Sequence, residues 1–248
     1  MEQQTQFPAE EVTLPSKGIL YSPESPLKDG ILEMKYMTAR EEDILTNQNL
    51  IANGTVIDKL LQSLIISKID YNELLIGDKD ALMVAARVLG YGSDYSFTYR
   101  GKEITVDLST LKDKPLSDEP IEKGKNEFEF ILPISKNKLT FKLLTNKDEN
   151  EIRKELEGLK KIDKNSSKEL STRLKYIILS VNGDYEKSTI RNFVDNQFLA
   201  KEAREFRKHV AQIQPSVDLS FDYEDNEGNI TKVDIPVGLD FFWPDATI

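Results

Sequence analysis

The feature that most constrains the fold is a repeated change in the spacing of apolar residues along the chain. In residues 38–92 and 145–213, apolar side chains recur every three or four positions, which predicts amphipathic helices. Between and after these blocks, short runs of alternating apolar and polar residues come in pairs joined by turn residues, which predicts antiparallel β-hairpins. We therefore predict an α+β protein with two helical groups and antiparallel β-hairpins.

Start and stop signals give the predicted elements approximate bounds. Thr38-Ala-Arg-Glu41 and Ser166-Ser-Lys-Glu169 have the form of a capping box, in which a hydroxyl and a carboxylate satisfy each other's backbone donors. Helices are predicted over about 38–46, 55–66, 78–89, 145–161, 166–183 and 188–213. Hairpins are predicted from strands at 95–99 with 104–108, at 128–132 with 139–143, and at 217–223 with 231–235.

Proline sets the predicted domain boundaries. Residues 1–36 contain four prolines, and each proline fixes φ and removes a backbone donor, so we predict an extended N-terminal arm there. The polar stretch 112–127, with two prolines and a glycine, predicts a linker. The helical group and first hairpin of 37–111 are then separated from 128–248, which holds the second hairpin, the second helical group and the last hairpin. We expect these two parts to share one core or to adjoin.

Charge and composition exclude several classes of function. The chain has 43 acidic and 33 basic side chains, a net charge of −10, whereas a nucleic-acid binder normally presents a basic face. We therefore expect neither nucleic acid nor an anionic membrane as a partner. The absence of cysteine excludes disulfides, thiol nucleophiles and thiolate metal sites. The N-terminus does not read as a signal peptide, and no apolar run is long enough to span a bilayer.

Patterns for catalysis or metal binding are weak. The single histidine, His209, has no nucleophile or orienting acid arranged around it in the sequence, so it reads as a packed or solvated helix residue. The acidic turn Asp222–Gly228 is similar to a calcium loop, but its glycine falls one place late and no glutamate follows at the twelfth position. We predict no enzymatic activity, no cofactor and no metal. A hydrolytic enzyme is the disfavoured alternative, since it requires an acid or nucleophile cluster that the sequence does not supply.

Two apolar stretches have no assigned role in the predicted helices and hairpins. One lies in the N-terminal arm and the other is an aromatic cluster near the C-terminus. Exposed clusters of this kind usually mark an interface, although the same side chains could instead fold back onto the chain's own core. We predict that both stretches bind a partner protein, through Leu14, Pro15, Lys17, Gly18, Leu20, Tyr21, Phe241, Phe242 and Trp243.

The arm also carries a family resemblance. Leu14-Pro-Ser-Lys-Gly18-Ile-Leu-Tyr21, followed by Met37-Thr-Ala-Arg-Glu-Glu-Asp-Ile-Leu45, is similar to the opening of the baseplate hub proteins of T-even-like tailed bacteriophages. Further similar stretches follow in the same order at 80–92, 132–133, 141–145, 180–183 and 241–244. The resemblance implies a role in building the central hub of a contractile tail, as a hub subunit or a hub-assembly factor. The implied partners are other baseplate or hub proteins, and no catalysis is implied.

The resemblance leaves two points open. The chain could instead be a chaperone, absent from the finished virion, for the tape-measure protein or another tail protein. The expected location is the host cytoplasm during assembly, and also the virion for a hub subunit. Some relatives carry paired cysteines, as in zinc knuckles, in the hairpins that correspond to 99–104 and 223–228. Those positions hold no cysteine here, so no zinc site is carried over, and we expect ordinary turns to close both hairpins.

Overall fold

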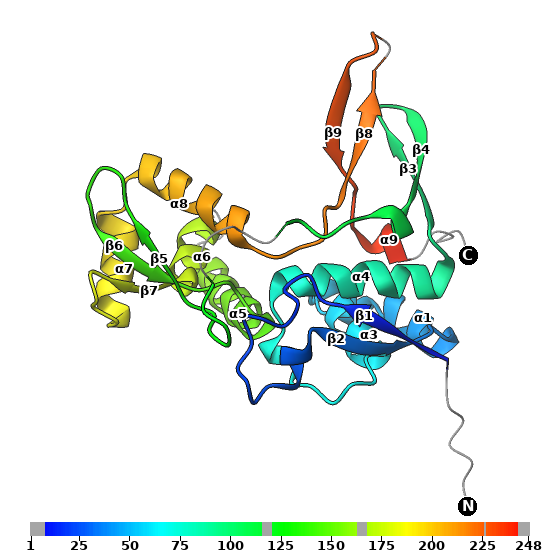
Figure 1. Cartoon of the computed structure of the whole chain (residues 1–248), viewed down its shortest axis with the longest axis horizontal. Coiled ribbons are helices and arrows are strands. Elements are labelled where there is room, and N and C mark those ends of the chain that lie inside the picture. The colour runs from blue at the N-terminus through cyan, green and yellow to red at the C-terminus, as the bar shows by residue number, and fades with distance from the viewer. Residues whose placement is uncertain (1–7, 116–120, 163–167, 226, 243–248) are drawn as a thin grey trace, which may run out of the picture.

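The computed structural model describes residues 8–115, 121–162, 168–225 and 227–242. Two lobes lie side by side, and two β-hairpins project together from one of them (Figure 1). In the described part of the chain, α-helices are combined with small antiparallel sheets of two or three strands. The predicted α+β class is therefore confirmed.

The first lobe is a short sheet packed on helices. Strand β1 (Ala9–Thr13) pairs antiparallel with β2 (Ile31–Lys35), and both contact α4 (Ile76–Tyr91). The lobe also holds α1 (Ala39–Leu45), α2 (Gln48–Ala52), α3 (Val56–Leu64) and the 3₁₀ turns η1 (Pro26–Asp29) and η2 (Tyr71–Glu73). The carboxylate of Glu41 accepts the backbone N–H of Thr38 at 3.0 Å. This is the hydrogen bond that the glutamate contributes to the predicted capping box at the start of α1.

Over the described residues of 1–36, the predicted N-terminal arm is a pair of extended strands joined by a compact loop. The chain leaves β1 at Leu14, makes a compact loop, and returns at Gly30, whose carbonyl accepts the N–H of Leu14 at 2.8 Å. A Cβ on Gly18 would lie 2.1 Å from the carbonyl oxygen of Lys28, so the two limbs of the loop touch. Three of the four prolines occupy turns or the start of η1: Pro26, for example, begins η1 directly after the N-cap Ser25. Proline excluded a central strand here, but it did not exclude a compact loop.

The second lobe is a three-stranded sheet covered by helices. Strands β5 (Phe128–Ile131), β6 (Lys138–Phe141) and β7 (Ile178–Val181) are antiparallel neighbours in that order. The helices are α5 (Asn146–Ile162), α6 (Glu169–Ile177), α7 (Lys187–Asn196) and α8 (Ala200–Ile213).

Two predicted helices of this lobe are corrected. The helix predicted over 166–183 ends at Ile177, and the next four residues form β7 beside β6. A short buried apolar run has no periodicity that separates helix from strand, and here pairing with β6 decides the outcome. The helix predicted over 188–213 is divided at 197–199 into α7 and α8. Ser166 of the second predicted capping box lies outside the described residues.

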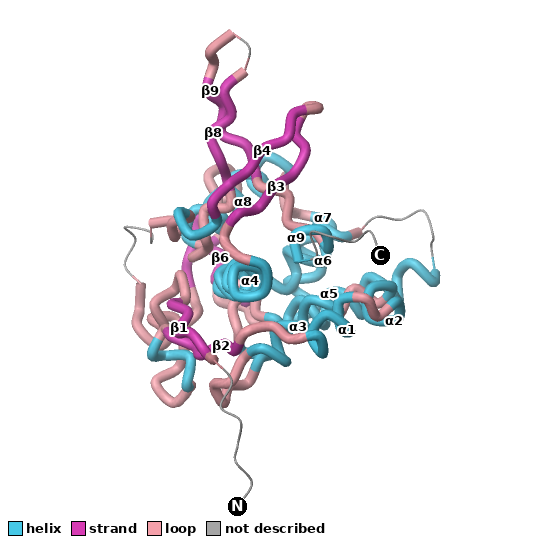
Figure 2. Tube along the Cα trace, turned by 90° about the vertical axis from the view of Figure 1, so that its right-hand side faces the viewer, coloured by secondary structure: helices cyan, strands magenta, loops and turns pink. Residues whose placement is uncertain are grey.

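The C-terminal segment crosses back to the first lobe, so 128–248 is not a separate unit. Strands β8 (Ser220–Glu224) and β9 (Ile230–Asp234) pack against β3 (Asp94–Tyr99) and β4 (Lys102–Asp107), as Figure 2 shows from the side. The ring centroids of Phe97 and Phe221 lie 5.4 Å apart. Each two-stranded hairpin has one apolar face that needs cover, and the two hairpins cover each other. The short helix α9 (Leu239–Phe242) then packs on α4.

The N-terminal end of the predicted linker 112–127 pairs with residues 216–218, which precede β8. Beyond the 3₁₀ turn η3 (Leu108–Thr110), the N–H of Lys114 donates to the carbonyl of Ser216 and that of Asp218 to the carbonyl of Lys112, both at 2.8 Å. At its other end the side chain of Asn126 donates to the carbonyl of Leu143 and accepts the N–H of the same residue. Residues 116–120 lie outside the described residues.

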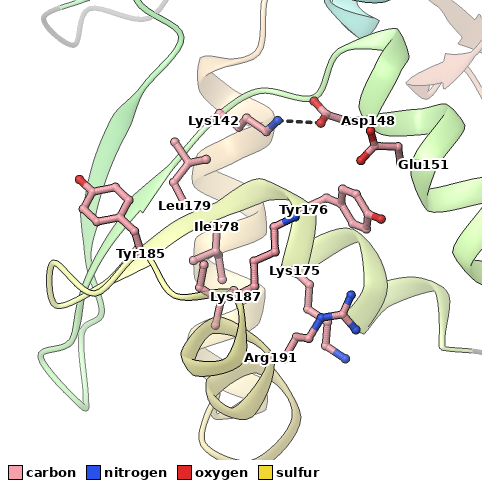
Figure 3. A pocket seen from close by; sticks show the side chains of 11 residues that line it. Lys142, Asp148, Glu151, Lys175, Tyr176, Ile178, Leu179, Tyr185, Lys187 and Arg191 are labelled. Atoms are coloured by element: carbon pink, nitrogen blue, oxygen red, sulfur yellow. Dashed lines mark hydrogen bonds and ion pairs between the residues drawn. The ribbon is translucent and has the colours of Figure 1, made fainter.

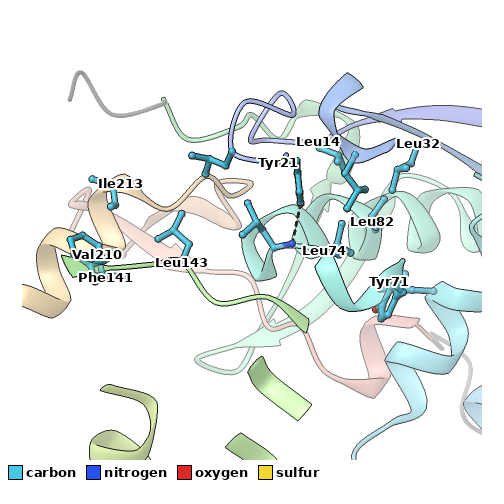
Figure 4. Packing of buried hydrophobic residues seen from close by; sticks show 14 of the residues in the cluster. Leu14, Tyr21, Leu32, Tyr71, Leu74, Leu82, Phe141, Leu143, Val210 and Ile213 are labelled. Carbon is cyan, nitrogen blue, oxygen red and sulfur yellow. Dashed lines mark hydrogen bonds between the residues drawn. The ribbon is translucent and has the colours of Figure 1, made fainter. Parts of the chain in front are cut away.

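One core runs through both lobes. Figure 4 shows its buried side chains passing from Leu14 and Tyr21 through Leu74 to Leu143 and Ile213. Backbone pairing joins the lobes at the same place, since Ile76 donates its N–H to Leu144 at 3.0 Å and Asn146 donates to Leu74 at 2.8 Å. The two parts of the chain therefore share a core rather than merely adjoin.

Candidate functional site

The predicted docking residues of the N-terminal stretch are mostly part of the chain's own core. Side chains at 0–7% exposure, such as Leu14 and Tyr21, have no surface to offer a partner. The prediction is therefore wrong for the buried members, which are Leu14, Pro15, Gly18, Leu20 and Tyr21. Lys17 is exposed, and its ammonium group forms an ion pair with Asp113. The sequence identified these residues as special, but their burial gives them a structural role.

A buried carboxylate holds this loop on α4. Asp78, which is 0% exposed in the first turn of the helix, accepts the backbone N–H of Ser16 at 2.8 Å and its hydroxyl at 2.7 Å. The hydroxyl of Tyr21 donates to the same carboxylate at 2.6 Å. It also accepts the N–H of Leu75 at 3.0 Å, drawn as the dashed line at Tyr21 in Figure 4. The loop and the helix are thereby fastened by hydrogen bonds that are shielded from solvent.

The electrostatics of this cluster fit a structural role. Burial raises the pKa of Asp78, because desolvation outweighs the hydrogen bonds from Tyr21 and Ser16 that favour its charged form. Burial, and then the charge of Asp78, raise the pKa of Tyr21 well above its usual range. Shifted pKa values can mark catalytic groups, but a carboxylate with no exposed surface and three donors is already satisfied by the fold.

The C-terminal aromatic residues also fold back. Phe241 and Phe242 are 0% and 1% exposed, so the predicted partner binding is wrong for both and the alternative of folding back is observed. The ring of Phe241 lies 4.9 Å from that of Tyr95, edge to face. Tyr95 also donates its hydroxyl to the carbonyl of Pro236 at 2.9 Å, which fixes the chain that leads into α9. Trp243 lies outside the described residues.

Turn residues close the two projecting hairpins, as expected. Arg100 and Gly101 both have positive φ, 49° and 77°, which suits a tight two-residue turn. In the second hairpin the carboxylate of Asp225 accepts the N–H groups of Glu227 and Asn229 at 2.8 and 2.9 Å. The acidic side chain that suggested a calcium loop is thus used for turn formation. The end of β3 also contacts β8, since the rings of Tyr99 and Tyr223 are 4.9 Å apart.

The best candidate for a functional surface is an apolar groove along α4. It has a volume of about 280 Å³ and is lined by residues of α4, of β1 and of the chain that leaves β4; Figure 1 shows where these elements lie. Its floor is made of small and medium side chains of the helix, and its rim carries acidic side chains. The floor residues are Ala81, Val84, Ala85, Val88 and Leu89; the walls are Val12, Leu108, Leu111 and Val217; the acids are Glu10, Glu11 and Asp113.

The apolar spacing predicts an amphipathic helix here, with one buried face, and so does not reveal the groove. A signal was present: between Ala81 and Leu89 the only charged residue is Arg87. A helix that is apolar on nearly every side must be covered on more than one face. The core covers one face, and the other is the floor of the groove.

A second cavity, of about 340 Å³, lies between β7, α5, α6 and α7 (Figure 3). It is lined by charged side chains of both signs, which would suit a polar ligand if they were unpaired. Three of its cations are neutralised by carboxylates, which removes most of the field that would attract an anion. The pairs are Lys142–Asp148, Lys175–Asp195 and Arg191–Glu155, with N···O distances of 2.6, 2.7 and 3.2 Å.

Within the described ranges, histidine, aspartate and glutamate side chains form no group of three or more that could hold a metal ion. None of the helices in the same ranges is both long and apolar enough to cross a membrane. Compared with known proteins, the chain matches no family model, no curated protein and no solved structure. The groove on α4 is thus the main basis for a functional assignment.

Proposed function

We propose that this chain is a subunit or assembly factor of a bacteriophage tail baseplate hub, which acts by docking on other tail proteins and catalyses no reaction. The observation that carries the docking role is the apolar groove on α4, which is open to solvent and rimmed by acids. Apolar grooves that stay open to solvent can receive the apolar side chains of a docked peptide segment. The hub role comes from the resemblance of the residues around Ser16 and Gly18.

The assignment is supported by the structural role of the residues that resemble the hub family. Ser16 and Tyr21 reach Asp78 only because the loop closes at Gly18 and Gly30, where the backbones are in contact. A sequence that combines these residues in this order specifies a defined loop on a defined helix. The similarity therefore concerns how the fold is built, and the docking surface is a separate feature of the same fold.

Two forms of the function use the same groove. A hub subunit would keep its partner and remain in the virion, whereas a chaperone for the tape-measure or another tail protein would release it in the host cytoplasm. The open groove, about 280 Å³ and lined by small side chains, suits either form. Mass spectrometry of purified virions separates them: recovery of this chain supports a subunit, and its presence in infected cells alone supports a chaperone.

The docking role is tested by affinity capture from infected cells with matched variants. Ala85→Gln fills the floor of the groove, while Ala211→Gln places the same side chain on an exposed position of α8. Both substitutions carry the same small cost in helix propensity. We expect wild type and Ala211→Gln to recover baseplate or hub proteins, and Ala85→Gln to recover at least tenfold less. Recovery of no tail protein by any form would contradict the hub role.

A further inference from the structure

Strand β1 has an edge that no other strand covers in the described part of the chain. Its only sheet partner there is β2. Leu14 donates its N–H to Gly30, and Tyr36 donates its N–H to Pro8. Because hydrogen-bonded pairs alternate along an antiparallel ladder, Glu10 and Val12 also direct their N–H and C=O groups toward β2. The N–H and C=O groups of 9, 11 and 13 therefore point away from β2, at the outer edge of the sheet.

The apolar groove of α4 runs beside this edge. Val12 lies opposite Leu32, which is buried, so these two side chains face α4. An extended segment laid along the outer edge of β1 would turn every second side chain toward the same helix. Ala81 and Ala85 line the groove there, and their small side chains leave space for those of the added strand. One extended ligand could therefore form backbone hydrogen bonds with β1 and bury apolar side chains against α4.

Charge defines the other face of that ligand. On the solvent side of the sheet, Glu11 and Glu33 lie directly opposite each other in register. Their positions form a non-hydrogen-bonded pair, in which side chains are close and like charges repel. Neither carboxylate forms an ion pair with any described residue. A lysine or arginine next to Glu11 on an added strand would relieve the repulsion.

We propose that the outer edge of β1 and the apolar floor on α4 form a strand-addition site for an extended segment of a partner protein, apolar toward α4 and basic toward solvent. The proposal deepens the docking role and rests on it for the partner being a tail protein. A second copy of this chain is a poor occupant, because pairing β1 with β1 would bring further copies of Glu11 toward Glu11 and Glu33.

The test uses a defined peptide with the purified full-length chain. The probe is a fluorescein-labelled Lys-Val-Lys-Val-Lys-Val-Lys peptide, and binding is followed by fluorescence anisotropy at low ionic strength. A peptide of the same composition with its lysines and valines in blocks measures binding by charge alone. A third peptide with glutamine in place of lysine, which carries no charge, measures binding by pattern alone. We expect the alternating basic peptide to bind at least tenfold more tightly than either control.

Two pairs of variants separate the parts of the site. Glu11→Gln and Glu11→Pro remove the same charge, but only proline removes the outward N–H, and an edge strand tolerates proline there. We expect Glu11→Gln to weaken binding about threefold and Glu11→Pro about tenfold more. Ala85→Gln should weaken binding about tenfold while Ala211→Gln leaves it unchanged. Circular dichroism of each variant checks that the fold is retained, and Ala85→Gln still tests the site if Glu11→Pro is unfolded.

Three outcomes would overturn the proposal. The first is equal binding by Glu11→Pro and Glu11→Gln together with unchanged binding by Ala85→Gln. The second is self-association of the wild type that Glu11→Pro abolishes, which would assign the edge to a second copy. The third is peptide binding that occurs only after residues 1–7 are deleted, which would make the chain's own N-terminal residues the occupant.

The two proposals fail in different ways. Peptide binding without capture of tail proteins would refute the hub role alone, and capture unaffected by Glu11→Pro and Ala85→Gln would refute the site alone.

Discussion

A buried carboxylate at the start of α1 provides a sharp test of how the first lobe is held together. Glu41 is 0% exposed and lies between β2, α1 and α3. One oxygen accepts the ammonium group of Lys35 at 2.8 Å and the hydroxyl of Ser63 at 2.7 Å, and the other accepts the hydroxyl of Thr38 at 2.6 Å. Burial opposes its charge, but the hydrogen bonds from Lys35, Thr38 and Ser63 outweigh burial and lower the pKa of Glu41 from 4.5 to about 2.

The magnitude follows from the difference in pKa between the folded and unfolded chain. A tenfold change in an equilibrium constant is about 1.4 kcal/mol, so the ionised Glu41 contributes up to about 3 kcal/mol to the free energy of unfolding at neutral pH. Glutamine at this position keeps one carbonyl oxygen as an acceptor. We therefore expect Glu41→Gln to lower the free energy of unfolding by about 2 kcal/mol at pH 7.

The pH dependence has a definite sign. The folded-state pKa of Glu41 is below its unfolded value, so its contribution is present above pH 4.5 and is lost as the pH falls from 4.5 toward about 2. Urea unfolding of wild type and Glu41→Gln, followed by circular dichroism across this range, should show the difference between them shrinking. Glu103→Gln, at an exposed position on β4, is the control and should match wild type. A deficit that stays constant down to pH 3, or that is absent at pH 7, would refute the reasoning.

Four further substitutions test other parts of the fold. Gly77→Ala should destabilise the chain by several kcal/mol or prevent folding, because its Cβ would lie 1.7 Å from the carbonyl oxygen of Pro215; Gly158→Ala in α5, where the site is open, should instead raise the melting temperature. Tyr21→Phe should lower the free energy of unfolding by about 2 kcal/mol, measured in urea, because it leaves the buried N–H of Leu75 without its acceptor. Phe221→Ala should cost about 3 kcal/mol or less and loosen the paired hairpins, seen as faster amide hydrogen exchange in β3 and β8; unchanged exchange would count against their mutual packing.

The sequence was most informative where local chemistry decides the structure. Thr38 and Glu41 predicted the start of α1, and the turn residues Arg100 and Gly101 predicted the end of β3, because capping and turn geometry depend on a few neighbouring residues. Long-range partners were not predictable in this way. Apolar spacing alone predicts a helix across the residues of β7, because the strand that pairs with them, β6, lies about 40 positions earlier.

The candidate site was missed for a related reason. Motif-like residues such as Leu14 and Phe241 attract attention in a sequence, yet both are buried in the core and contact no solvent. The groove instead depends on Ala85 and Val88 remaining partly exposed after β1 and η3 have been placed on either side of α4. Which face of an apolar helix stays open is a property of the assembled fold, and periodicity alone does not contain it.

The central claim, that the chain docks its partner along β1 and α4, is tested most directly by amide hydrogen exchange with and without a captured tail protein. The outward N–H groups of 9, 11 and 13 have no partner in the described structure, so their exchange should be fast in the isolated chain. We predict that exchange in peptides covering 8–14 slows at least tenfold in the complex. Slowed exchange confined to the hairpin tips or to the charged cavity beside α6, with 8–14 unchanged, would contradict the claim.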